Sequence, residues 1–99
     1  MSIVSINSKK AKLMIEKDEF DLIIDLRTKE LYENYNIKGS INIPFNEIGD
    51  KMNFLKEYKN KKILLYCEVG KTSKSASKVL AINGFSKIYN LSQGLKGYK

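Results

Sequence analysis

Two short segments with continuous apolar centres constrain the fold of this chain more than any other feature of its sequence. The segment Phe20–Leu26 reads FDLIIDL and the segment Ile63–Cys67 reads ILLYC. Continuous apolar runs of this length are typical of strands that are buried on both faces of a parallel sheet. The segments between such runs show the spacing of amphipathic helices, so the sequence predicts an α/β fold.

Shorter segments complete this alternation of strands and helices. Two helices are expected in the first half: one capped by Ser8 with Ala11, Met14 and Ile15 on one face, and a short one within residues 28–35. A brief strand Ile41–Ile43, which Pro44 ends or confines to an edge, and a helical stretch broken at Gly49 follow. The second half is expected to contain a helix that ends at Gly84 and a last strand Lys87–Leu91; the residues on one face of this helix are Ala76, Val79, Leu80 and Asn83. A hydrophobic content of 42% over 99 residues is enough for one core. We therefore expect a single domain over residues 1–99, with a mainly parallel sheet of four or five strands and helices on both faces.

Charge and cysteine content exclude several classes of partner. The net charge is +7, but the lysines are scattered along the chain and Arg27 is the only arginine. Proteins that read bases usually carry arginine, so we expect no nucleic-acid partner. The longest unbroken apolar stretch has five residues, far short of the ~20 that span a bilayer, so we expect no membrane partner. A lone cysteine and the lack of a secretory pattern favour the reducing cytoplasm.

The single cysteine, Cys67, stands where parallel sheets place ligands. It ends a buried strand, and a short loop then leads into a helix. Backbone N–H groups of that loop can turn inward around the sulfur and, with the amino end of the helix, favour a thiolate. The loop residues that we expect to form this binding site are Glu68, Val69, Gly70, Lys71, Thr72 and Ser73. The alternative is an inert buried thiol, and the carboxylate of Glu68 counts slightly against activation.

Two other interpretations of this loop match its sequence poorly. A phosphate-binding loop of the GxxxxGKT type needs a glycine five residues before Gly70, and Leu65 occupies that position. A cysteine-dependent phosphatase needs an arginine six residues after its nucleophile, and Ser73 stands there instead. Without the planar fork of an arginine, such an enzyme lacks its main grip on phosphate.

The chain resembles the single-domain rhodaneses, a family of sulfurtransferases, in two separate segments. The family's active loop reads Cys-x-x-Gly-x-Arg-Ser, followed by a helix, a Gly-Phe turn, a strand and a Leu-x-Gly-Gly segment. The matching residues are Cys67, Gly70, Ser73, Gly84, Phe85, Leu91, Gly94 and approximately Tyr98, and, in the first half, Asp25, Arg27, Ile37, Gly39 and Ile41–Pro44. Three departures are Thr72 in place of the loop arginine, Asn36 in place of a histidine, and Gln93 in place of the first glycine of the pair.

This resemblance implies a sulfurtransferase that works through a persulfide on Cys67. The thiolate takes a sulfane sulfur from a small anionic donor such as thiosulfate, and then passes it to a thiol, to cyanide or to a partner-protein cysteine. Lys71 is expected to replace part of the missing arginine's charge, and Asp25 and Arg27 are expected to support the loop, as an ion pair. No metal and no organic cofactor are expected. The alternative within the family is a binding or regulatory module without turnover.

Overall fold

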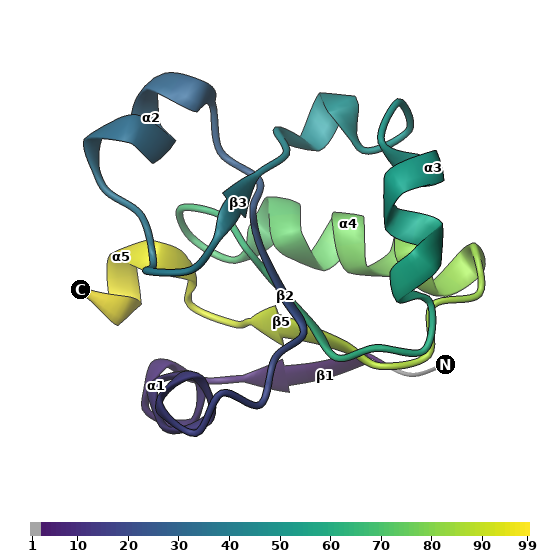
Figure 1. Cartoon of the computed structure of the whole chain (residues 1–99). Coiled ribbons are helices and arrows are strands. Elements are labelled where there is room, and N and C mark those ends of the chain that lie inside the picture. Colours follow the sequence, from purple (N-terminus) through teal and green to yellow (C-terminus); the bar gives the residue numbers. More distant parts are fainter. Residues whose placement is uncertain (1–2) are drawn as a thin grey trace.

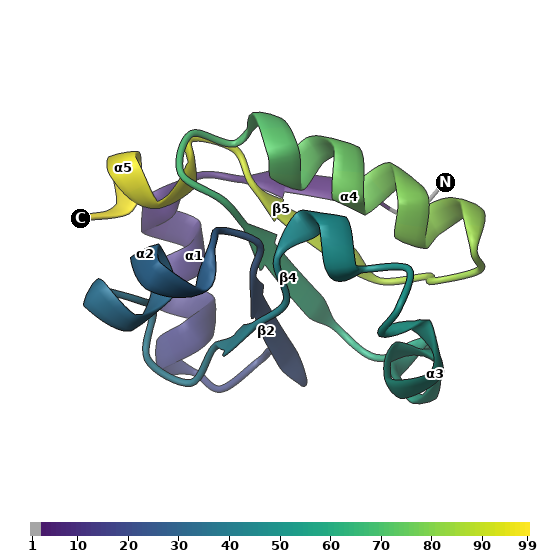
Figure 2. The same ribbon diagram turned by 90° about the horizontal axis from the view of Figure 1, so that it is seen from above.

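Five parallel strands form the centre of the molecule, in the computed structural model that describes residues 3–99. The order of the strands across the sheet is β1-β5-β4-β2-β3, so β4 is the middle strand. Figure 1 labels the outer strands β1 and β3 and their neighbours β5 and β2, and Figure 2 labels β4 between β5 and β2. The strands are β1 (Ile3–Ile6), β2 (Leu22–Asp25), β3 (Ile41–Asn42), β4 (Ile63–Tyr66) and β5 (Ile88–Leu91). All four pairings are parallel, so every strand ends at the same edge of the sheet.

Helices cover both faces of this sheet, as Figure 2 shows from above. The helices are α1 (Ser8–Glu16), α2 (Lys29–Asn34), α3 (Met52–Leu55), α4 (Lys71–Ile82) and α5 (Gly94–Tyr98), with short 3-10 turns η1 (Phe45–Glu47) and η2 (Lys56–Tyr58). Helices α1 and α5 pack on one face, and α3 and α4 pack on the other. The α/β fold with a parallel sheet between helices is therefore confirmed.

Strands β2 and β4 have no exposed face, which explains why all their residues except Asp25 are apolar. Alternate side chains of β4 enter opposite cores: Leu65 packs with α4, and Leu64 packs with α1. Residues Ile24 and Ile23 of β2 divide in the same way. Because successive side chains of a strand point to opposite sides, both faces need apolar residues.

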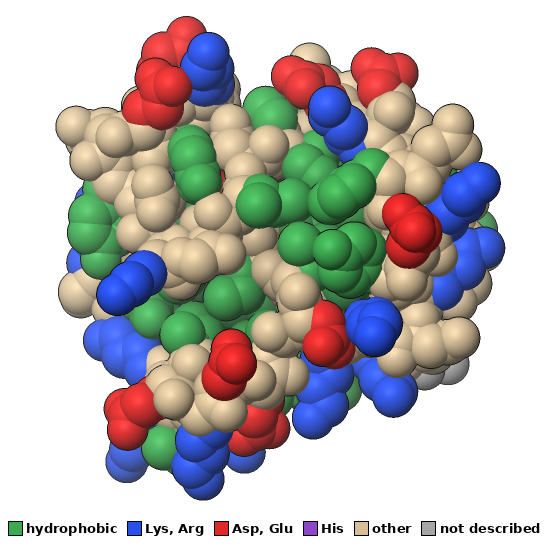
Figure 3. Space-filling model, viewed as in Figure 1, with side chains coloured by type: hydrophobic (Ala, Val, Ile, Leu, Met, Phe, Trp, Pro, Cys, Tyr) green, Lys and Arg blue, Asp and Glu red, His purple; other side chains and the backbone are tan. Residues whose placement is uncertain are grey.

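The edges of the sheet carry a different pattern. Strand β3 has only two residues and lies at an edge, and Pro44 follows shortly after it, as expected for a proline that cannot join a central strand. Hydrophobic side chains gather on this side of the molecule, over the region between β3 and α3 (Figure 3). Ile41 of β3 and Met52 of α3 are partly buried against the core.

Most helix boundaries follow the local signals in the sequence. Thr28 caps α2, and Gly84 comes after the end of α4. The predicted cap of α1 is wrong by one residue: the cap is Asn7, whose side chain accepts a hydrogen bond of 2.8 Å from the backbone N–H of Lys10. Ser8 is instead the first residue of the helix. Asparagine and serine cap about equally well, so sequence alone does not rank these two neighbours.

Two elements were not anticipated, β1 and α5. Strand β1 is an edge strand whose Val4 is half exposed, so it lacks a long apolar run. Helix α5 has five residues and contains two glycines, Gly94 and Gly97, which disfavour helices in general. No helix within residues 3–99 has the length and hydropathy needed to cross a membrane.

Candidate active site

Cys67 lies at the floor of a pocket at the carboxyl edge of the sheet. It directly follows β4, and only 4% of its surface is exposed. The pocket has a volume of about 400 Å³. Its walls come from the end of β2, from α2, from η1 and from the loop after Cys67, and they include Leu26, Leu31, Pro44, Phe45, Glu68 and Thr72. The thiol is thus shielded by the fold but open to a visiting molecule on one side.

Two backbone N–H groups donate hydrogen bonds to the sulfur. The N–H of Gly70 and the N–H of Ser73 both lie 3.2 Å from Cys67 Sγ. Ser73 is in the first turn of α4, where N–H groups have no partner inside the helix and are free to bind another acceptor. Gly70 adopts a φ of +93°, a left-handed conformation that turns the chain from β4 back into α4.

The other predicted loop residues lie in different surroundings. The side chains of Glu68 and Thr72 line the pocket, and Val69 is 56% exposed. Lys71 is exposed on α4 and does not line the pocket, so the sequence-based idea that it stands in for the missing arginine receives no support from its position. The structure therefore brings together Cys67, Glu68, Gly70, Thr72 and Ser73, and leaves Val69 and Lys71 outside.

A buried polar cluster holds the start of α4 against β5. The hydroxyl of Ser73 donates to Oδ1 of Asn90 and lies 3.2 Å from the carbonyl oxygen of Gly70, which is a second acceptor. The hydroxyl of Ser77 in turn donates to the carbonyl of Ser73 at 2.7 Å. Sequence reasoning missed Asn90; the available signal was a polar residue within the otherwise apolar strand β5.

Helix α5 supports the loop from the other side. The N–H groups of Leu95 and Lys96, in its first turn, donate to the carbonyls of Cys67 and Glu68 at 2.8 and 3.0 Å. These two hydrogen bonds attach the start of the active loop to α5. Gly94 lies so close to the loop that a Cβ atom would be 2.4 Å from the carbonyl oxygen of Glu68.

Asp25 and Arg27 form the ion pair expected at the end of β2. Nη2 and Nε of Arg27 donate to the carboxylate of Asp25 at 2.9 and 3.1 Å, and the Arg27 side chain is only 5% exposed. Nη1 of Arg27 donates to Oε1 of Glu68 at 3.3 Å, and Nη2 also donates to the carbonyl of Tyr35. Burial alone would lower the pKa of Arg27, but the hydrogen bond and the charge of Asp25 outweigh burial and raise it. Arg27 thus connects β2 to the active loop.

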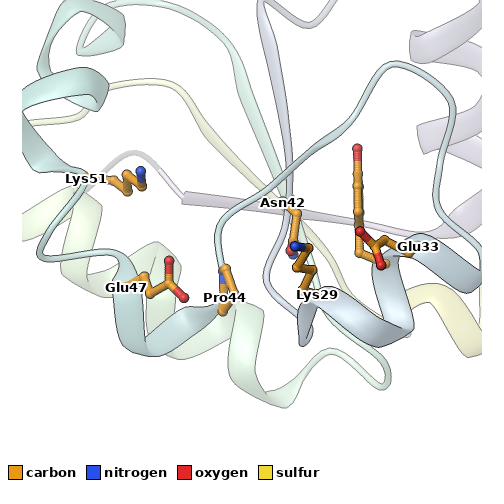
Figure 4. Close-up of a pocket in the computed structure, with 7 residues that line it drawn as sticks. Lys29, Glu33, Asn42, Pro44, Glu47 and Lys51 are labelled. Carbon is orange, nitrogen blue, oxygen red and sulfur yellow. The ribbon is translucent and has the colours of Figure 1, made fainter.

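A second hollow lies beside the Cys67 pocket and shares Pro44 with it. Figure 4 shows that Lys29 and Glu33 reach it from α2, and that Glu47 and Lys51 reach it from η1 and the start of α3. Its volume is about 330 Å³. Two lysines and two glutamates balance one another there, and no cysteine lines this hollow, so the candidate site remains the pocket of Cys67.

Comparison with known proteins identifies the family of the chain. The family model described as Rhodanese-like domain matches residues 7–99. The chain belongs to the rhodanese-like domain family. The solved structure of a rhodanese-like domain protein from Staphylococcus aureus superposes with a TM-score of 0.87 and 25% sequence identity, over 97% of this chain and 91% of that one.

Several relatives of this rhodanese-like domain carry names from sulfur chemistry. Thiosulfate sulfurtransferase PspE of Escherichia coli is 33% identical over 73 residues, which are 74% of this chain and 69% of that protein. YrkF of Bacillus subtilis, named as a sulfur carrier protein, is 32% identical over 98% of this chain and 51% of its own length.

A tRNA uridine(34) hydroxylase of Buchnera aphidicola is 28% identical over 94% of this chain. The chain spans about half of YrkF and 31% of the hydroxylase.

Proposed function

We propose that this rhodanese-like domain is a sulfurtransferase that carries sulfur as a persulfide on Cys67. The observation that carries the proposal is the pair of N–H groups, from Gly70 and Ser73, that donate to Sγ at the floor of an open pocket. Backbone donors of this kind favour negative charge on sulfur, as they favour an oxyanion in other enzymes, where one donor contributes about 2.7–4 kcal/mol. The relative named thiosulfate sulfurtransferase supports the same chemistry.

The reaction has two displacements at sulfur. In the first, the Cys67 thiolate attacks the outer sulfur of a donor such as thiosulfate; the new S–S bond forms as the bond to sulfite breaks, and sulfite leaves with the electron pair. In the second, a thiolate acceptor, cyanide or a partner-protein cysteine attacks the terminal sulfur and releases the Cys67 thiolate. Such covalent catalysis produces ping-pong kinetics. Neither displacement requires a metal or an organic cofactor.

The surrounding residues have supporting roles in this proposal. Asp25 holds Arg27, and Arg27 holds Glu68, so that the first residue after the nucleophile keeps its place. Thr72 lines the pocket and supplies a hydroxyl to a bound donor. Residues 1–99 act as a single domain in this scheme. A lone cysteine that must stay reduced suits the cytoplasm.

The alternative function is a rhodanese-like binding module that performs no turnover. A phosphatase is a weaker alternative, because Ser73 stands where the arginine is needed and its hydroxyl binds Asn90 and Gly70 within the loop. The open pocket and the two N–H donors to Sγ favour the transferase over the binding module. A binding role does not require a sulfur atom that accepts two hydrogen bonds at the floor of the pocket.

Intact-mass measurement tests the proposal. The reduced protein is incubated with thiosulfate and, separately, with benzenethiosulfonate, before and after treatment with a reductant. We expect the wild type to gain the mass of one sulfur atom, reversibly, and the Cys67→Ser variant to gain none. A wild type that takes up sulfur from neither donor would overturn the transferase and favour the binding module. Release of phosphate from aryl phosphates would favour the phosphatase.

A further inference from the structure

The Cys67 pocket carries an excess of negative charge. Of the residues that line it, only Arg27 and Glu68 are charged. The positive charge of Arg27 is already matched by Asp25, which is fully buried. One guanidinium therefore stands against two carboxylates, a local sum of −1, before the charge of the thiolate is added.

Glu68 is fixed at the mouth of this pocket. Its Oε1 accepts from Arg27 at 3.3 Å, and its backbone carbonyl accepts from Lys96 at 3.0 Å. Glu68 lines the pocket and its side chain is 47% exposed, so its negative charge lies close to any donor that occupies the pocket. Neither of two neighbouring lysines adds positive charge to the pocket lining. Lys71, three residues after Glu68, does not line the pocket, and Lys29, two residues after Arg27, lines the neighbouring hollow (Figure 4).

Apart from the uncharged polar residues Thr28, Asn46 and Thr72, the rest of the pocket lining is apolar. Leu31 and Phe45 line it and are 46% and 39% exposed. Leu26 and Pro44 continue the same wall. Exposed apolar side chains around a reactive group favour a ligand that covers them with an apolar surface of its own.

We infer that Glu68 biases this site toward donors that carry their sulfur on an apolar organic body with at most one negative charge, and disfavours the thiosulfate dianion. The inference rests on the proposed persulfide chemistry. With an aryl thiosulfonate, the Cys67 thiolate bonds to the outer sulfur as the S–SO2 bond breaks, and the aryl sulfinate leaves with the electron pair. Repulsion by Glu68 opposes thiosulfate twice as strongly as such a monoanion, because Coulomb energy scales with the product of the charges.

The experiment compares the second-order rates of persulfide formation with thiosulfate and with benzenethiosulfonate, in wild type and Glu68→Gln. Two unit charges about 4 Å apart in water interact by ~1 kcal/mol, which salt reduces. We therefore expect Glu68→Gln to accelerate the reaction with thiosulfate about fivefold and that with benzenethiosulfonate about twofold. Raising the ionic strength should accelerate the reaction of the wild type with thiosulfate and have a smaller effect on the variant.

A matched control separates this local effect from the net charge. Glu57→Gln removes the same charge at a distant hollow lined by Asp21, Phe54 and Lys61, and we expect it to leave both rates unchanged. Equal acceleration of both donors in Glu68→Gln, or slower reaction of thiosulfate, would overturn the inference while the persulfide itself stands. Failure of both donors to load the wild type would instead overturn the proposed function, and the inference with it.

Discussion

Ser73 contributes to the position of the sulfur through three of its groups. Its N–H donates to Cys67 Sγ, its hydroxyl donates to Asn90, and its carbonyl accepts from Ser77. Each link is buried, so removing one leaves a polar group without a partner. Asn90 is therefore a positioning residue for Cys67 in the proposed reaction, although it does not contact the sulfur.

Removing either side of the Ser73–Asn90 hydrogen bond should slow the reaction of Cys67. We expect Ser73→Ala and Asn90→Ala each to lower the free energy of unfolding by about 1–3 kcal/mol and to slow alkylation of Cys67 by iodoacetamide. Because both substitutions break the same hydrogen bond, the double variant should lose less free energy of unfolding than the sum of the two single losses. The check is urea unfolding together with alkylation rates across pH. Ser75→Ala, on the exposed side of α4, is the control; fully additive losses would contradict the prediction.

The sequence allowed some of these residues to be predicted, but not their contacts. Cys67, Gly70 and Ser73 follow from the spacing of one loop, because the loop is local. The contact between Arg27 and Glu68 joins positions 41 residues apart, and the role of Asn90 depends on which strand lies behind α4. Such contacts follow from the tertiary structure, so the local pattern could indicate the nucleophile but not the groups that hold it.

At the scale of elements, the active loop is confined between α4, α5 and the end of β5. A Cβ atom on Gly70 would lie 2.1 Å from the carbonyl oxygen of Ser92, immediately after β5. The backbone at Gly70 is therefore in direct contact with the backbone at Ser92, and no side chain fits between them.

Gly70→Ala should therefore be strongly destabilising. The new methyl group would collide with the Ser92 carbonyl, and a φ of +93° is strained for any residue with a Cβ. We expect a loss of about 2–4 kcal/mol in the free energy of unfolding, measured by urea denaturation. Gly49→Ala is the matched control, because a Cβ there meets no atom within 4 Å. Similar stability of the two variants would show that the contact with Ser92 relaxes easily.

The elements themselves were predictable to different degrees. The buried strands β2 and β4 and the helix α4 follow from strong local patterns, and the structure confirms them. Strand β1 has an exposed central pair and pairs with β5, so its order depends on a partner far along the chain. Helix α5 has too few residues to form in isolation; its N–H groups are held by the carbonyls of the active loop instead.

For the whole molecule, Tyr66 connects the middle of the sheet to the segment that precedes β3. The hydroxyl oxygen of Tyr66 accepts from the backbone N–H of Ile37 at 3.0 Å and lies 3.1 Å from the hydroxyl of Ser40. The side chain is fully buried, and this burial raises the pKa of Tyr66. The folded protein therefore favours the neutral phenol, whereas the unfolded chain ionises it near pH 10.

Stability should consequently fall at alkaline pH in a way that depends on Tyr66. The contribution of Tyr66 to the free energy of unfolding is complete below about pH 10. Above that pH it declines by about 1.4 kcal/mol per pH unit, because only the unfolded state releases the phenol proton. We expect Tyr66→Phe to be less stable near neutrality by about 1–3 kcal/mol, yet to have a shallower decline above pH 10 in urea titrations. An unchanged slope in Tyr66→Phe would be the contrary result.

The pairing of β1 with β5 also affects how the protein is made. Ile3 lies opposite Ile88, and Ile6 lies opposite Leu91, so β1 has no neighbour in the sheet until the residues of β5, more than 80 positions later, have been synthesised. Closing such a long loop is entropically costly and slows folding. During synthesis β1 therefore remains an unpaired, partly apolar segment, and it can join the sheet only after β5 has emerged.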